Sequence, residues 1–144
     1  MTFEKFDKYF IKEMHKWALP VLRYSLGIVF LWFGLLKVAG VSPVAGLVSQ
    51  AYSFLPAHGF LVFLGIWEVL IGLGLIFNVW LRATLALLWL QMLGTFTALI
   101  LAPHMFFNDG NVFLLSTEGE FIIKNLVLIA SSIVIGGYGV KTND

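Results

Sequence analysis

Five polar side chains stand within or at the ends of long apolar stretches of this sequence. They are Lys37, Glu68, Gln91, Lys124 and Asn125. A carboxylate near amines and amides can form an ion pair, exchange a proton, or hydrogen-bond a bound molecule. Ionisable groups are costly in lipid, so within membrane segments they face one another or a cavity. These five residues are therefore the candidates for a ligand-binding polar cluster.

The composition shows which surroundings these residues need. The chain has 144 residues, 60% of them hydrophobic and only 12% charged, with a mean hydropathy of +0.93. Too few charges remain to solvate a globular domain of this length, so we expect the protein to lie in lipid. The net charge of +1 gives no basis for binding nucleic acid. The sequence contains no cysteine, which excludes thiol chemistry within the chain.

Four apolar segments account for most of the sequence. Each is close to the ~20 residues that a helix needs to cross a bilayer. Backbone groups in lipid must pair within their own segment, so we expect helices. The predicted fold is an all-α four-transmembrane-helix bundle forming a single membrane domain over residues 1–144. The predicted spans are residues 18–39, 59–78, 82–102 and 121–138.

An N-terminal arm, residues 1–17, precedes the first span. Its large apolar residues recur at helical spacing, and most of its charged residues fall elsewhere on the helix. This pattern predicts an amphipathic helix at the membrane interface, and docking of a partner is the alternative interpretation. The apolar positions are Phe3, Phe6, Phe10, Met14 and Trp17.

Lysine and arginine are distributed unevenly between the two sides of the predicted bundle. Loops 40–58 and 103–120 contain neither residue. The N-terminal arm, the turn near Arg82 and the C-terminal segment with Lys141 carry the positive charges. The positive-inside rule therefore places both termini in the cytoplasm and the two long loops outside. The lipid bilayer is the main predicted partner.

Small residues share helix faces with the polar ones. Gly27 and Gly34 align with Lys37 in the first span, and Gly65 and Gly72 flank a glutamate in the second. Small residues let membrane helices approach closely, so these faces are expected to point into the bundle. At 1.5 Å per residue, the polar groups converge on the outer half of the bundle.

Three interpretations of this convergence are open. The glutamate can pair with a lysine simply to fix helix order, while the other lysine reaches outward. The cluster can line an outward-opening pocket for a quinone head group or another small polar or anionic molecule. It can also form a proton or ion path. The predicted pocket walls are Trp32, Trp67 and Trp89, and no metal site is predicted because no convincing ligand set occurs.

The chain resembles the DoxX-like integral membrane proteins. Within that family it resembles the branch that includes the reactive-chlorine-resistance membrane proteins. The matching stretches are Ile28–Lys37 (IVFLWFGLLK), Gly65–Gly72 (GIWEVLIG) and Gly119–Leu126 (GEFIIKNL). The resemblance extends over all four segments. It implies a four-helix bundle in the bacterial inner membrane and a role beside quinone-linked or oxidative-stress proteins. The family's recurring polar positions correspond to Lys37, Glu68, Lys124 and Asn125.

These observations favour a small redox- or stress-associated accessory subunit whose polar pocket takes a quinone. The sequence has no visible redox centre, so electron transfer would require a bound cofactor or a partner, such as another membrane or redox subunit. Two alternatives belong to other functional classes. One is a transporter or channel for a small solute or protons, which could be a homo-oligomer. The other is a purely structural subunit of a larger complex.

Overall fold

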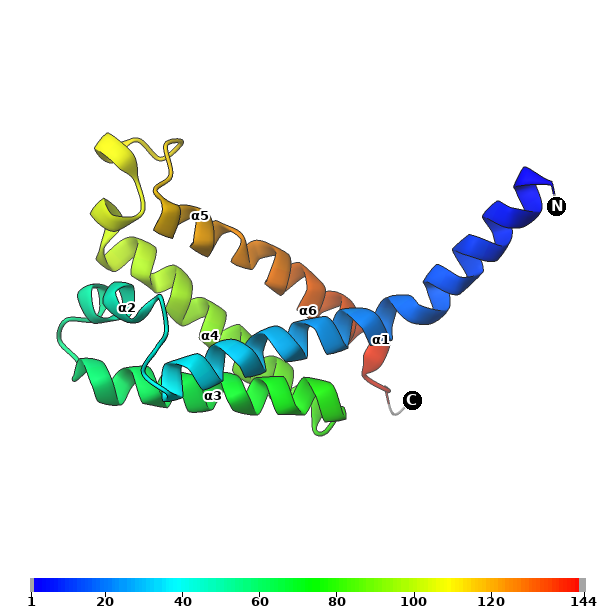
Figure 1. The fold of residues 1–144 in the computed structure, drawn as a ribbon, viewed down its shortest axis with the longest axis horizontal. Coiled ribbons are helices and arrows are strands. Elements are labelled where there is room, and N and C mark those ends of the chain that lie inside the picture. The colour runs from blue at the N-terminus through cyan, green and yellow to red at the C-terminus, as the bar shows by residue number, and fades with distance from the viewer. Residues whose placement is uncertain (1, 143–144) are drawn as a thin grey trace.

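The computed structural model describes residues 2–142, and this part of the chain is largely helical (Figure 1). One isolated antiparallel bridge, between Phe107 and Leu115, is its single β feature. The all-α prediction is therefore confirmed. The α-helices are α1 (Phe3–Val38), α2 (Ala45–Ala51), α3 (Ala57–Phe77), α4 (Leu81–Leu101), α5 (Thr117–Ile123) and α6 (Asn125–Gly139); the 3-10 helices are η1 (Pro103–Met105) and η2 (Asn108–Gly110).

Four helical stretches are long and apolar enough to cross a membrane. They are α1, α3, α4, and α5 with α6 taken together as Thr117–Gly139. These match the four predicted spans in number and order. α3 and α4 begin and end within about two residues of the predicted boundaries. The fourth stretch begins earlier than predicted, because Ser116 caps α5 by accepting a hydrogen bond from the Gly119 amide.

The N-terminal arm is not a separate element in this structure. It forms one 36-residue helix with the first span, and the helix continues through Pro20. Figure 1 shows the arm projecting away from the other helices. The five apolar side chains of its predicted face are about half exposed or more, from 48% at Met14 to 83% at Phe3. An exposed aromatic face of this kind is suited to a membrane interface.

The bundle has two different ends. At the turn end, Asn78 and Trp80 adopt positive φ values of 54° and 45° and reverse the chain between α3 and α4. Arg82 follows this turn and donates a 3.1 Å hydrogen bond to the carbonyl oxygen of Lys141. The loop end carries α2, η1 and η2. This arrangement places the N-terminal arm and the C-terminal end of α6 away from the loops (Figure 1).

Packing also differs along the bundle. An apolar core that includes Leu26, Leu75 and Ile135 joins α1, α3, α4 and α6. α6 packs against both α1 and α4, whereas α5 packs against α4 and α6. Figure 1 shows α1 and α5 diverging toward the loop end. The bundle is therefore tightly filled toward the turn end and splayed toward the loop end.

The most extensive helix contact, between antiparallel α1 and α3, depends on glycine. A Cβ atom on Gly34 would lie 2.6 Å from the Gly65 carbonyl oxygen, and one on Gly72 would lie 2.8 Å from the Gly27 carbonyl oxygen. Real Cβ atoms do not approach so closely, so the two backbones touch at both levels. The heptad spacing of glycines on each helix thus fixes the register of α1 against α3.

Replacing a contact glycine by alanine should force these helices apart. We expect Gly34→Ala to destabilise the protein by about 1–3 kcal/mol, the usual penalty for overpacking. Thermal unfolding of the purified protein in detergent measures the change. The matched control is Gly94→Ala in α4, where a Cβ would meet no heavy atom within 4 Å. Equal melting temperatures for the two variants would contradict the proposed backbone contact.

Candidate functional site

The centre of the candidate site is an ion pair between Lys37 of α1 and Glu68 of α3. The ammonium nitrogen lies 2.6 Å from Oε2 of the carboxylate. The helix register set by the glycine contacts places the backbones of Lys37 and Glu68 about two turns apart along the bundle axis. Helical side chains lean toward the N-terminus of their own helix. Because α1 and α3 are antiparallel, the two side chains lean toward each other.

Gly65 provides the space for this approach. A Cβ atom at Gly65 would lie 2.9 Å from the Cβ of Lys37. The lysine stem therefore runs along α3 at the point where that helix has no side chain. The glycine and the glutamate three residues later belong to one helical face. The same face of α3 thus admits the amine and supplies its counter-ion.

The pair is buried and has a third member. The side chains of Lys37 and Glu68 are 8% and 10% exposed. Gln91 of α4 donates a 2.9 Å hydrogen bond from Nε2 to the second carboxylate oxygen, Oε1. Both oxygens of the carboxylate therefore have partners on neighbouring helices. This triad resolves the choice left open by the sequence, because Lys37 is the lysine that neutralises Glu68.

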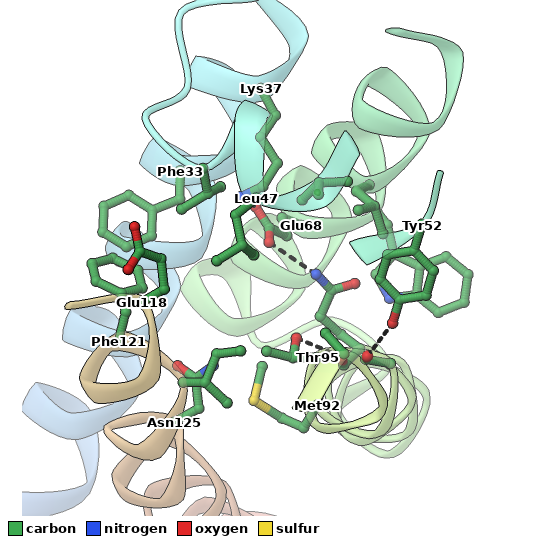
Figure 2. Close-up of a pocket in the computed structure, with 18 of the residues that line it drawn as sticks. Phe33, Lys37, Leu47, Tyr52, Glu68, Met92, Thr95, Glu118, Phe121 and Asn125 are labelled. Atoms are coloured by element: carbon green, nitrogen blue, oxygen red, sulfur yellow. Dashed lines mark hydrogen bonds and ion pairs between the residues drawn. The ribbon is translucent and has the colours of Figure 1, made fainter. Parts of the chain in front are cut away.

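A cavity of about 770 Å³ lies beside the triad in the loop-end half of the bundle. Its lining comes from α1 to α6 and η1. Figure 2 shows Phe121 of α5 and Asn125 of α6 on one side, and the Lys37–Glu68 pair on another. The volume falls in the range of small-molecule sites. The divergence of α5 from α1 leaves this space open.

Most of the cavity wall is apolar, and one side is a row of aromatic rings. Tyr52 and Phe60 have ring centroids 5.3 Å apart, and those of Phe63 and Trp67 are 5.6 Å apart. The Trp67 indole nitrogen donates a 3.0 Å hydrogen bond to the Leu87 carbonyl oxygen on α4. The Tyr52 hydroxyl donates to the Gly94 carbonyl oxygen. These two bonds hold the row against α4.

The structure separates the two predicted polar residues at the start of the fourth span. Asn125 lines the cavity and is half-buried. Lys124 is exposed and does not line it. Consecutive helical residues point about 100° apart, and the rotation of the helix here turns Asn125 toward the cavity and Lys124 away from it. The structure thus brings Lys37, Glu68, Gln91 and Asn125 to the cavity and leaves Lys124 outside.

Of the three predicted tryptophan walls, the structure places one at the cavity. Trp67 lines it. Trp32 is 63% exposed on the outside of α1. Trp89 lies on a different face of α4, where its indole nitrogen donates a 2.9 Å hydrogen bond to the Ser132 hydroxyl on α6. Residue type alone suggested all three, but the rotation of each helix selects one.

Several lining residues were not identified from the sequence. Phe33 and Phe121 flank the cavity, and Glu118 in the first turn of α5 lies near them (Figure 2). The sequence does contain a pattern that indicates part of this lining, because Phe60, Phe63 and Trp67 follow helical spacing on one face. The positions on α5 carried no such signal, since their orientation depends on how α5 departs from α1.

Within residues 2–142, no group of three or more histidine, aspartate or glutamate side chains is positioned to hold a metal ion. Comparison of the chain with protein-family models, curated proteins and solved structures finds no match in any of the three. The geometry of the cavity is therefore the basis for the proposals that follow.

The ion pair in the triad predicts how the stability of the protein changes when one of its charges is removed. Lys37→Met leaves a buried carboxylate without its cation, which should destabilise the protein by about 3–5 kcal/mol. We expect the double variant Lys37→Met/Glu68→Gln to lose less stability than the sum of the two single variants. Thermal unfolding in detergent measures all three.

Lys124→Met removes an exposed lysine and serves as the control. Its stability should stay within about 0.5 kcal/mol of the parent protein. Additive losses in the double variant would show that the two side chains do not depend on each other.

Proposed function

We propose that this protein is a multi-pass membrane protein whose loop-end cavity binds a small lipid-soluble molecule with a ring and carbonyl acceptors. Quinones are the biological class that combines these properties. The observation that carries the proposal is a buried, charge-neutral triad presenting N–H donors to an aromatic-lined space. Such a combination of apolar walls and few oriented polar groups is typical of ligand sites.

The hydrogen-bonding capacity of the triad supports an acceptor ligand. The Lys37 ammonium has three N–H groups and the Gln91 amide has two. Each uses one for the carboxylate of Glu68. The Asn125 amide makes no side-chain hydrogen bond within the described part of the chain. A carbonyl ligand can therefore accept from the triad on one side of the cavity and from Asn125 on the other.

The charges of the lining favour a neutral ligand over an anion. Lys37 and Glu68 neutralise each other, and Glu118 adds a further carboxylate. An anionic ligand would meet excess negative charge, with no unpaired cation to compensate it. A quinone avoids this penalty because it carries no charge.

The proposed biological role is that of an accessory membrane subunit associated with redox or stress-defence proteins. The resemblance to the DoxX-like proteins supports this role. The chain has no cysteine to relay electrons. Any electron transfer would therefore take place on the bound quinone and a partner protein, with this chain supplying binding and orientation.

Binding of a short-chain quinone to the purified protein tests the proposal. We expect saturable binding by titration calorimetry in detergent, and a loss of affinity of about tenfold, near 1.4 kcal/mol, in Asn125→Leu. Gln91→Leu should weaken binding to a similar extent. The matched control is Lys124→Met, one residue from Asn125 but outside the cavity.

Two results would contradict the proposal. One is the absence of saturable binding to a folded parent protein. The other is unchanged affinity in both cavity variants, which would place any bound quinone elsewhere.

We further propose that the loop end faces outward and that both termini are cytoplasmic. The support is the distribution of positive charge, since the arm, Arg82 and Lys141 all lie away from the loops (Figure 1). In this orientation the cavity lies in the outer half of the bilayer.

Cysteine labelling tests this orientation cleanly, because the chain contains no cysteine. In intact bacterial cells, a membrane-impermeant maleimide should label Asn111→Cys in the loop but not Lys141→Cys. Lys141→Cys should react only after the membrane is opened. The reverse pattern would show that the loop end faces the cytoplasm.

A further inference from the structure

We infer that the cavity takes its ligand from the lipid phase, through a lateral portal between α1 and α5, and that the ligand carries a long apolar tail that stays in this portal. This inference rests on the proposed function and deepens it. The inference narrows the class of ligand. A membrane quinone with a long tail and a small water-soluble ring would use the same hydrogen-bond donors, so only the path of entry separates them.

The first observation is the composition of the portal. Val29 and Phe33 of α1 and Phe121 of α5 all line the cavity. They are also 36%, 42% and 48% exposed. Exposed cavity-lining side chains on two helices that diverge from each other mark an opening between those helices (Figure 1). All three are apolar and lie on membrane-spanning helices, so the opening faces lipid chains.

The second observation is that the two sides of this opening have no polar contact within the described part of the chain. Within residues 2–142, no hydrogen bond or ion pair connects α1 with α5. α5 is instead held to the loop end, where the Ser116 hydroxyl donates a 2.6 Å hydrogen bond to the Met105 carbonyl oxygen. Gly119 lies directly beneath the Phe106 carbonyl, leaving no room there for a Cβ. α5 is thereby fixed apart from α1.

The opposite side of the cavity provides an internal comparison. Phe63 of α3 and Leu90 of α4 also line the cavity and are 52% and 55% exposed. There, however, the Trp67–Leu87 hydrogen bond joins α3 to α4. The hydrogen bond from Tyr52 to Gly94 joins the segment after α2 to α4. The α3–α4 side is bridged, so the α1–α5 side is the better entrance.

The loop end itself is partly covered by apolar packing. Ala51 of α2, Phe106 beside η1 and Ile122 of α5 belong to one buried cluster with residues of α4. This cover is incomplete, because the exposed residues Pro43, Gln50 and Glu118 at the loop end also line the cavity. An apolar ligand tail that left in that direction would enter water beside Gln50 and Glu118, whereas the portal leads into lipid.

A tail in the portal would be stabilised by contact with the phenyl rings of Phe33 and Phe121. Each buried methylene is worth about 0.8 kcal/mol relative to water. The ring would meanwhile stay at the triad and Asn125. This division of the ligand, polar ring inside and tail outside, fits an isoprenoid quinone better than a soluble aromatic molecule.

Two matched cysteine variants test the portal. Phe33→Cys and Phe63→Cys replace exposed phenylalanines that line the same cavity on opposite sides. Each is labelled with a bulky maleimide in detergent, and binding of a tail-less quinone and of a long-tailed quinone is measured by calorimetry. We expect the label at Phe33→Cys to weaken the tailed compound at least about tenfold and the tail-less compound less than about twofold. Phe121→Cys should behave likewise, whereas the label at Phe63→Cys should change the affinities of both compounds by the same factor, because Phe63 lines the cavity but not the portal.

The possible failures are distinguishable. If neither quinone binds the unlabelled protein, the proposed function fails and this inference fails with it. If both bind, the portal is overturned when labels at Phe33→Cys and Phe121→Cys leave the tailed compound unaffected. It is also overturned when those labels weaken both compounds equally, or when the label at Phe63→Cys selectively weakens the tailed one.

Discussion

Contact between the backbones of α1 and α3 is the constraint on which the remaining structure depends. Gly34 and Gly65 bring the two chains together at one level, and Gly27 and Gly72 do so two turns away. This contact fixes the register of the helices, and the register places Lys37 and Glu68 where their leaning side chains meet. A bulkier side chain at Gly65 would occupy the space of the lysine stem itself.

The ion pair in turn explains how the bundle keeps an open space. Charges in lipid are costly, so the pair must be shielded by other helices, and Gln91 of α4 completes the shield. On the remaining side, α5 is held to the loop end by Ser116 and Gly119 rather than packed against α1. The result is a neutral polar triad at the edge of an aromatic cavity. A purely structural ion pair would not require this cavity or its unpaired donors.

The sequence was sufficient for the number of spans, their order and the convergence of Lys37, Glu68 and Gln91, because length and polarity leave few alternatives in lipid. It was insufficient where the rotation of a helix about its axis determines which side chains face the cavity. Lys124 and Asn125 are adjacent, and only packing selects which of them faces inward. Trp89 was predicted as a cavity wall from its residue type, yet its indole nitrogen donates to Ser132 instead. The departure of α5 from α1 depends on contacts with distant loop residues and leaves no periodic signal.

A high-resolution experimental structure of the protein with a long-tailed quinone tests the central claim most directly. The account predicts a ring between the triad and Asn125, with a carbonyl oxygen within hydrogen-bond distance of Lys37 or Gln91 and the tail leaving between α1 and α5. A closed Lys37–Glu68 pair facing a collapsed cavity, with the quinone bound elsewhere or absent, would contradict it and leave the ion pair as a device for helix packing alone.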